Sequence, residues 1–317
     1  MRYNPKARLD RSQVENRRGS GGGGGGGGFP IGGGGGGGLR VGGGIGGLVL
    51  LVIIFLVQSQ LGGGSGAGPG DQGAGQGTGQ GTGQGSTSLA QCRSGTDANQ
   101  DPDCALVADV NSIQAFWNDY LPQAAGTDYT NASTRIFSGS TSTGCGGATA
   151  DVGPFYCPVD KHVYLDTTFF KDMLQGQLGA KGGPFSQAYV LAHEYGHHVQ
   201  DLLGTMSKVR TQQGANSDAV RLELQADCYA GIWTKHATSA DDSGGEPYIL
   251  DLTQDDIARA LDAAAAVGDD RIQRKSSGRV DPDRWTHGSA ESRMRWFTTG
   301  MKKGTLEACD TFSASRL

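Results

Sequence analysis

Residues 193–197 read His-Glu-Tyr-Gly-His, and this stretch constrains the fold more than any other in the chain. Two histidines four positions apart lie on one face of a helix, about 40° apart around its axis. Both imidazoles can then bind one metal ion, and Glu194 can reach a water molecule on that ion. We therefore expect His193 and His197 to be metal ligands and Glu194 to be the general base of a hydrolase.

The flanks of this motif favour a continuous helix. The chain runs on without a break after Pro184, apolar spacing continues to Leu203, and Gly204 is a suitable C-terminal end. Gly196 costs a helix interior up to ~1 kcal/mol, which is tolerable where a neighbouring backbone packs close to the helix. Taken alone, a five-residue match also arises by chance, and a buried histidine is more often a hydrogen-bonded core residue than a ligand.

A second helical pattern, at residues 217–235, carries two carboxylates four positions apart. A catalytic zinc ion uses three protein ligands and keeps one position open, so we expect Glu223 to be the third ligand. Asp227 lies on the same face and is expected to accept the free ring N–H of a ligating histidine, which fixes its tautomer. Without the histidine motif, a solvated helix face would be the commoner explanation of this pair.

The chain resembles the neutral zinc metallopeptidases of bacterial envelopes, zincins whose third ligand is a glutamate. This resemblance implies Zn²⁺ as cofactor and a peptide or protein as substrate, but the family has no well-defined substrate to carry over. It does not extend to the glycine tracts. The segments that carry it are HEYGHHVQ (193–200), ELQADCYAG (223–231), HGSA (287–290), RWF (295–297), GPFYCP (153–158), VYLD (163–166) and NRRG (16–19).

His287 is our candidate for the donor that stabilises the oxyanion formed during hydrolysis, and one such donor is typically worth ~3 kcal/mol of barrier. The candidacy rests on the resemblance and on its position before a helical pattern at 289–299, which we expect to end at Gly300. A capping or surface histidine is the alternative. His198 lies about 140° around the helix from His193 and should bond a neighbouring element. We expect His162 and His236 to be surface or structural residues.

The remaining patterns mix helices and strands. Helices are predicted at 105–121 and 253–267, and short strands at 135–137, 155–157 and 162–165. Together with the metal motif, these elements indicate an α+β, zincin-like metallopeptidase domain.

An uncharged apolar segment, residues 45–57, precedes this domain, and with residues 41–44 it reaches about the seventeen residues that a membrane span needs. No small-x-small cleavage site follows Val57, which argues against a signal peptide. Seven basic and two acidic residues come before the segment and predict a cytoplasmic N-terminus. The expected protein is single-pass in a bacterial cell membrane, with its catalytic domain outside. Its segments are a basic, Gly-rich cytoplasmic region (1–44), an anchor (45–61), a linker (62–90) and the zinc metallopeptidase domain (91–317).

All six cysteines follow the apolar segment, as expected of an exported domain with disulfide bonds. Six cysteines allow 15 pairings, and the sequence alone does not choose among them. We expect the set that closes two short loops and ties the C-terminal tail to the carboxylate helix. The competing idea, thiolate zinc ligands, lacks any Cys-x-x-Cys pair. The expected pairs are Cys92–Cys104, Cys145–Cys157 and Cys228–Cys309.

Charge and composition limit the classes of ligand and partner that the protein is expected to bind. The chain has 27 basic and 32 acidic residues, and outside the basic head the balance is 20 to 30, so we expect no nucleic-acid binding. Many of the 56 glycines lie in the tracts 20–28 and 32–38 and in the repeat 74–85. These tracts predict flexible linkers, because no strand precedes them and no helix start follows, as a phosphate loop would require.

Two classes of function fit these patterns. The first is a membrane-anchored, zinc-dependent endopeptidase that hydrolyses peptide bonds of envelope or extracellular proteins, with Glu194 as general base to a zinc-activated water. The alternative is a noncatalytic, zinc-stabilised module that binds partners or scaffolds an envelope complex. Glu194 favours the enzyme, because a structural zinc site has no use for a general base and usually closes its fourth position.

Overall fold

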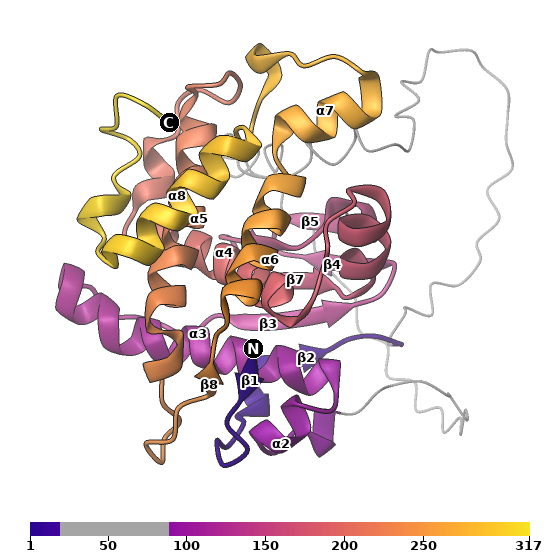
Figure 1. Cartoon of the computed structure of the whole chain (residues 1–317), viewed down its shortest axis with the longest axis vertical. Coiled ribbons are helices and arrows are strands. Elements are labelled where there is room, and N and C mark those ends of the chain that lie inside the picture. Colours follow the sequence, from indigo (N-terminus) through magenta and orange to yellow (C-terminus); the bar gives the residue numbers. More distant parts are fainter. Residues whose placement is uncertain (20–88) are drawn as a thin grey trace, which may run out of the picture.

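The computed structural model describes residues 1–19 and 89–317 of the 317-residue chain. These residues form a mixed α+β fold in which helices pack against a small sheet (Figure 1). The expected anchor at 45–61 and nearly all of the expected linker lie outside the described residues. Within the described part, no helix has the length and apolar character needed to cross a membrane.

The main sheet has four strands in the order β2-β3-β7-β6. Strands β2, β3 and β7 are parallel, and β6 is antiparallel to β7, so β6 forms one edge. The three strands predicted from the sequence are confirmed within a residue or two at each end. Their bounds are Val14–Asn16 (β2), Ser133–Phe137 (β3), Phe155–Cys157 (β6) and His162–Asp166 (β7).

The predicted helices are also confirmed, and all but the helix that carries the histidine motif have a side-chain N-cap. Ser217 accepts a hydrogen bond from the backbone N–H of Val220, and Thr253 and Asp256 form a capping box. The principal helices are α3 (Pro102–Ala125), α4 (Pro184–Leu202), α5 (Asp218–His236), α6 (Gln254–Ala266) and α8 (Ala290–Lys303).

Shorter elements, most of which the sequence did not reveal, complete the fold. The short α-helices are α2 (Gly95–Ala98) and α7 (Asp269–Ser277), and η5 (Phe169–Gln177) is π-helical. The remaining strands are β1 (Arg2–Tyr3), β4 (Ser140–Thr143), β5 (Gly146–Thr149) and β8 (Ile249–Asp251). The 3₁₀ turns are η1 (Arg11–Gln13), η3 (Leu89–Gln91), η4 (Ala150–Val152), η6 (Thr205–Lys208), η7 (Ala237–Ser239), η8 (Pro282–Arg284) and η9 (Glu307–Cys309).

Helices α5 and α8 lie side by side and touch through glycine (Figure 1). A Cβ atom added to Gly231 would lie 2.1 Å from the carbonyl oxygen of Phe297, and one added to Gly300 would lie 1.9 Å from that of Cys228. The prediction that the last helix ends at Gly300 is therefore wrong. Gly300 serves helix packing, and the helix continues to Lys303 before Gly304 ends it at a φ of 73°.

Residues 1–19 belong to the same fold as residues 89–317. Strand β1 pairs with β8, and β2 extends the main sheet beside β3. Ala7 is fully buried. The backbone of Asn4 passes so close to α2 that a Cβ atom on Gly95 would lie 1.9 Å from the Asn4 carbonyl oxygen.

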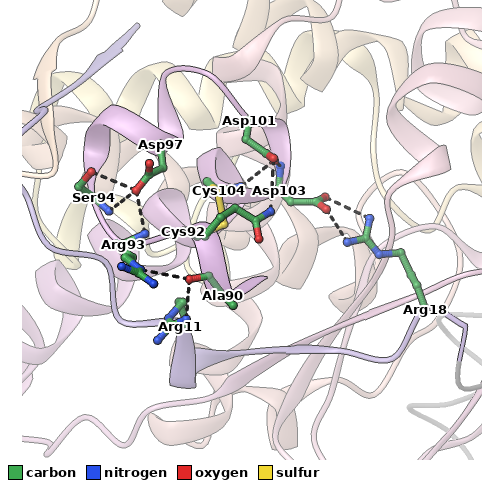
Figure 2. The surroundings of a disulfide bond; sticks show 11 residues. Arg11, Arg18, Ala90, Cys92, Arg93, Ser94, Asp97, Asp101, Asp103 and Cys104 are labelled. Atoms are coloured by element: carbon green, nitrogen blue, oxygen red, sulfur yellow. Dashed lines mark hydrogen bonds and ion pairs between the residues drawn. A yellow bond between two sulfur atoms is a disulfide. The ribbon is translucent and has the colours of Figure 1, made fainter. Parts of the chain in front are cut away.

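Polar contacts hold this N-terminal segment as well. The hydroxyl of Tyr3 donates to the buried carboxylate of Asp109 on α3 at 2.8 Å. The guanidinium of Arg18 makes two hydrogen bonds to Asp103, at 3.1 and 2.6 Å, beside the Cys92–Cys104 disulfide (Figure 2). The expected separation of a cytoplasmic segment 1–44 from an external domain stays a prediction, and the packing of residues 1–19 on that domain argues against it for these residues. A single membrane crossing between residues 19 and 89 would put these contacts on opposite sides of the bilayer.

The three disulfides are the pairs expected from the sequence. Cys92–Cys104 and Cys145–Cys157 each close a loop of 12 residues, and Cys228–Cys309 spans 81 residues to fasten the C-terminal tail to α5. All six cysteines lie in the described part of the chain and are paired in this way.

Ala7→Arg tests whether the N-terminal segment docks in the full-length protein. A long charged side chain at this fully buried position would overpack the fold and lose its hydration, so we expect the free energy of unfolding to fall by about 3 kcal/mol or more. Thermal or denaturant unfolding measures the effect. Lys6→Ala, a change at an exposed neighbour, is the control and should stay within ~0.5 kcal/mol of wild type. Equal stability of Ala7→Arg and wild type would show that residues 1–19 do not pack on the domain.

Candidate active site

Helix α4 carries the histidine motif in its buried part, as expected. Gly196 faces α5, and a Cβ atom there would lie 3.0 Å from the carbonyl oxygen of Ala226. The missing side chain therefore lets the two helix backbones approach closely. This approach brings Glu223 of α5 opposite His193 and His197.

These three side chains form a compact group of possible metal ligands. The Nε2 atom of His193 lies 3.2 Å from one carboxylate oxygen of Glu223, and the Nε2 atom of His197 lies 3.4 Å from the other. One ligand atom from each residue lies within 4.8 Å of the other two. Two imidazole nitrogens and one carboxylate oxygen are the ligands of a catalytic Zn²⁺ site with one open position. The residues present fit this ion.

Hydrogen bonds to the outer nitrogens of both imidazoles turn their Nε2 atoms toward the group. Nδ1 of His193 bonds the carboxylate of Asp227 at 2.9 Å, and Nδ1 of His197 bonds the side-chain oxygen of Gln200 at 2.8 Å. Asp227 thus makes the hydrogen bond to a histidine ring that its position on the helix face predicted. Such contacts fix the tautomer of a ligating histidine and increase its basicity.

Arg293 of α8 holds Asp227 from the other side. Its guanidinium donates to both carboxylate oxygens, at 2.8 and 3.0 Å, and the Tyr189 hydroxyl donates to one of them at 2.5 Å. Sequence reasoning missed Arg293, Tyr189 and Gln200. Arg293 and the more exposed Arg295 lie two residues apart on one helix, and no local pattern shows which of them is buried.

Burial and the neighbouring charges shift the pKa values of these residues in opposite directions. Burial lowers the pKa of His193, but Asp227 and Glu223 outweigh it and raise that pKa to about 10. Burial raises the pKa of Asp227, and Arg293 together with His193 brings it below its ordinary value. For Glu223, burial is likewise outweighed by His287 and His197, which hold its pKa well below the usual range. The ligand carboxylate and its neighbour are therefore ionised.

Glu194 is buried beside the ligand group. Among the described residues, its carboxylate has no charged partner as near as His193 is to Glu223 or Arg293 is to Asp227. Burial dominates and raises the pKa of its carboxyl above the ordinary value. A carboxylate with a raised pKa is a better proton acceptor at neutral pH.

His287 lies in the loop before α8 and lines the same cavity as Glu194. The helix cap is Ser289, so the capping alternative for His287 is not what the structure shows. Asp269, a residue missed from the sequence, accepts hydrogen bonds from three successive backbone N–H groups of this loop, at 2.7 to 2.8 Å. Burial lowers the pKa of His287, but Glu223 and Asp269 raise it on balance.

The other histidines lie away from the ligand group. His198 is fully buried and bonds the Tyr156 hydroxyl at 3.0 Å and the Thr130 carbonyl at 2.6 Å, which confirms that it faces a neighbouring element. His236 stacks on Phe116, with ring centroids 5.4 Å apart. His162 bonds the backbone carbonyl of Asp160.

Two histidines and a glutamate around one point, with a buried carboxylate beside them, define a zinc-hydrolase class of site. A family model described as "Putative neutral zinc metallopeptidase" matches residues 1–312. The chain belongs to this family, whose cofactor is Zn²⁺.

Relatives in several bacteria share much of the sequence. The chain is 53% identical over 231 residues to the uncharacterized protein Rv2575 of Mycobacterium tuberculosis, covering 72% of this chain and 77% of the relative. The same figures hold for Mb2605 of Mycobacterium bovis. The chain described here is also 45% identical over 196 residues to the uncharacterized protein YpfJ of Escherichia coli K12, which covers 60% of this chain and 64% of the relative. No solved structure matches the chain.

Substitutions at Glu223 and Asp227 should separate a ligand from a residue that orients one. Glu223→Ala removes the ligand oxygen, so we expect the purified protein to contain no zinc. Asp227→Asn keeps the shape but weakens the bond to His193, and zinc affinity should fall about 10- to 100-fold and recover in excess zinc. Metal analysis after dialysis against graded free zinc measures both, with circular dichroism to check folding. Loss of zinc beyond recovery in Asp227→Asn, with retention in Glu223→Ala, would exchange the two roles.

Proposed function

We propose that this protein is a zinc-dependent endopeptidase of the HExxH type with a zincin-like catalytic domain. The observation that carries the proposal is the position of Glu194. Its carboxyl group lines one cavity together with His193, His197, Glu223 and His287. A zinc site that only stabilised a binding module would not need a buried proton acceptor beside an accessible cavity. The noncatalytic alternative is therefore the weaker one.

Each residue then has a role in peptide hydrolysis. Zinc, when bound, polarises the peptide carbonyl and lowers the pKa of a water molecule toward ~7. Glu194 takes the proton of the attacking water and returns it to the leaving amine. His287, whose raised pKa favours the protonated form, donates a hydrogen bond to the oxyanion. Asp227 holds the His193 ring in place, and Arg293 keeps Asp227 ionised and oriented.

The substrate in this proposal is a peptide or protein of the envelope or the extracellular space. Three disulfides in one domain suit an oxidising compartment outside the cytoplasm. Membrane attachment through the apolar residues 45–57 is part of the proposal. Because residues 1–19 pack on the catalytic domain, we place them on the same side of the membrane as that domain, so the proposed attachment does not use residues 45–57 as a single crossing of the bilayer.

Glu194→Gln tests the proposed general base. The amide cannot accept the proton, so kcat/KM for peptide cleavage should fall by roughly 10²- to 10⁴-fold while zinc stays bound. Cleavage of a fluorogenic peptide library and metal analysis of the same samples measure both effects. His193→Ala and His197→Ala should lose zinc and activity together. Undiminished cleavage by zinc-loaded Glu194→Gln would refute the assignment.

Lysine labelling tests the placement of the two ends. Lys6 and Lys302 are both exposed, and a membrane-impermeant amine reagent should label both in intact spheroplasts. Mass spectrometry of the purified protein reads the result, and a cytoplasmic protein is the control for leakage. Labelling of Lys302 alone would show that the N-terminus lies in the cytoplasm. Labelling of both only after lysis would contradict an external domain.

A further inference from the structure

The metal-ligand group and a set of apolar side chains line one cavity of about 130 Å³. We define the apolar pocket as the part of this cavity that is lined by the side chains of Phe155, Phe169, Met173, Val190 and Ile272. All five retain exposed fractions of 4 to 8%, in contrast to the fully buried core. Their atoms are therefore accessible to a group that enters from the active site.

The walls of the pocket come from elements that are fixed independently of one another. Phe155 lies on β6, which pairs with β7 and is tied by the Cys145–Cys157 disulfide to the loop between β4 and β5. Phe169 and Met173 come from the π-helical segment η5. Val190 belongs to α4 itself, and Ile272 belongs to α7. A pocket between several anchored elements keeps its shape when no ligand is present, as most ligand sites do.

Charge is distributed unevenly along this cavity. Every histidine, arginine and carboxylate that lines it belongs to the metal-ligand group or its immediate surroundings, and among residues 1–19 and 89–317 no lysine or further acid lines the apolar walls. A charged side chain against these apolar walls would lose its hydration without gaining a counter-ion there, which is unfavourable. An apolar side chain is stabilised in proportion to the apolar area that it buries.

The size of the pocket indicates which apolar side chains fit. An apolar protein cavity of roughly 150 Å³ holds a benzene molecule, so the whole cavity here, its metal-ligand end included, has room for one group the size of a leucine, methionine or phenylalanine side chain. Alanine would leave most of it unfilled.

The position of the pocket connects it to the proposed chemistry. Val190 lies one helical turn before Glu194, and side chains four residues apart on a helix are roughly 5 to 6 Å from each other at Cβ. A substrate side chain against Val190 therefore lies next to the carboxylate that acts on the scissile bond. We propose that this pocket is the main specificity subsite and binds a leucine, methionine or phenylalanine side chain directly beside the cleaved bond. This inference rests on the proposed function, because the subsite is defined relative to Glu194.

The first test compares peptides that differ only at the residue beside the cleaved bond. We expect kcat/KM for leucine or phenylalanine to exceed that for alanine by roughly 10- to 100-fold, and lysine or aspartate to be cleaved more slowly still. Equal cleavage of all five peptides by the zinc-loaded enzyme would overturn the subsite and leave the peptidase proposal standing.

Two variants assign the preference to these walls. Val190→Phe fills the pocket beside Glu194 and should reverse the preference, with the alanine peptide cleaved faster than the phenylalanine peptide. Met173→Ala enlarges the pocket and should reduce the preference for leucine over alanine; it also provides a test if Val190→Phe does not fold. The control is Ile113→Val, a change in the fully buried core on α3 outside the pocket, which should keep the wild-type ratio. Wild-type ratios in both pocket variants would place the specificity elsewhere.

A binding measurement separates this inference from the peptidase proposal. Zinc-loaded Glu194→Gln is titrated with the labelled phenylalanine and alanine peptides, and fluorescence anisotropy gives the two dissociation constants. Binding of the phenylalanine peptide at least tenfold more tightly, with the difference lost after Val190→Phe in the same background, supports the pocket even if the wild type cleaves nothing. Equal affinities contradict the pocket whether or not cleavage occurs.

Discussion

The close contact between helices α4 and α5 at Gly196 is the constraint on which the site depends. A methyl group at this position would lie 3.0 to 3.3 Å from atoms of Ala226, which is tighter than ordinary packing. With only a hydrogen there, the histidine face of α4 meets the carboxylate face of α5. The ligand group therefore results from backbone packing, and its three side chains need no unusual reach to meet.

A third helix completes the charge balance of the site. Asp227 lies between His193 and Arg293, all three buried, and Arg293 belongs to α8. Helix α8 approaches α5 closely enough because Gly231 and Gly300 lack side chains at the contact. A buried carboxylate with one partner removed is costly, of the order of 3 to 5 kcal/mol. The glycines of two helix contacts and the buried ion pair are thus parts of one arrangement.

Contacts made by both ends of the chain stabilise the elements that surround these helices. Residues 1–19 cover α3 and extend the main sheet at the edge away from β6, and Cys228–Cys309 fastens the C-terminal tail to α5. The sheet reaches α4 through the bond between the hydroxyls of Thr134 and Tyr195, at 2.9 Å. The edge strand β6 is left beside the cavity, where its side chains form one wall.

Local patterns in the sequence determined the helices, their caps and the spacing of the metal ligands. The 3.6-residue period alone puts His193 and His197, or Glu223 and Asp227, on one helix face, so these residues were found without the fold. The disulfide pairs were expected from the short loops that two of them close, but the sequence alone allows 15 pairings, and the fold decided among them.

Tertiary structure decided everything that depends on distant segments. Arg293 and Asp269 carry no local signal, because their partners are 66 and about 18 residues away in the sequence. The same is true of the N-terminal segment, whose basic charges suggested the cytoplasm while its buried Ala7 and Tyr3 show packing on the domain. Gly300 looked like a helix end, since sequence shows that a side chain is absent but not which neighbouring backbone occupies its place. Charge and periodicity are local properties, whereas burial is a property of the assembled fold.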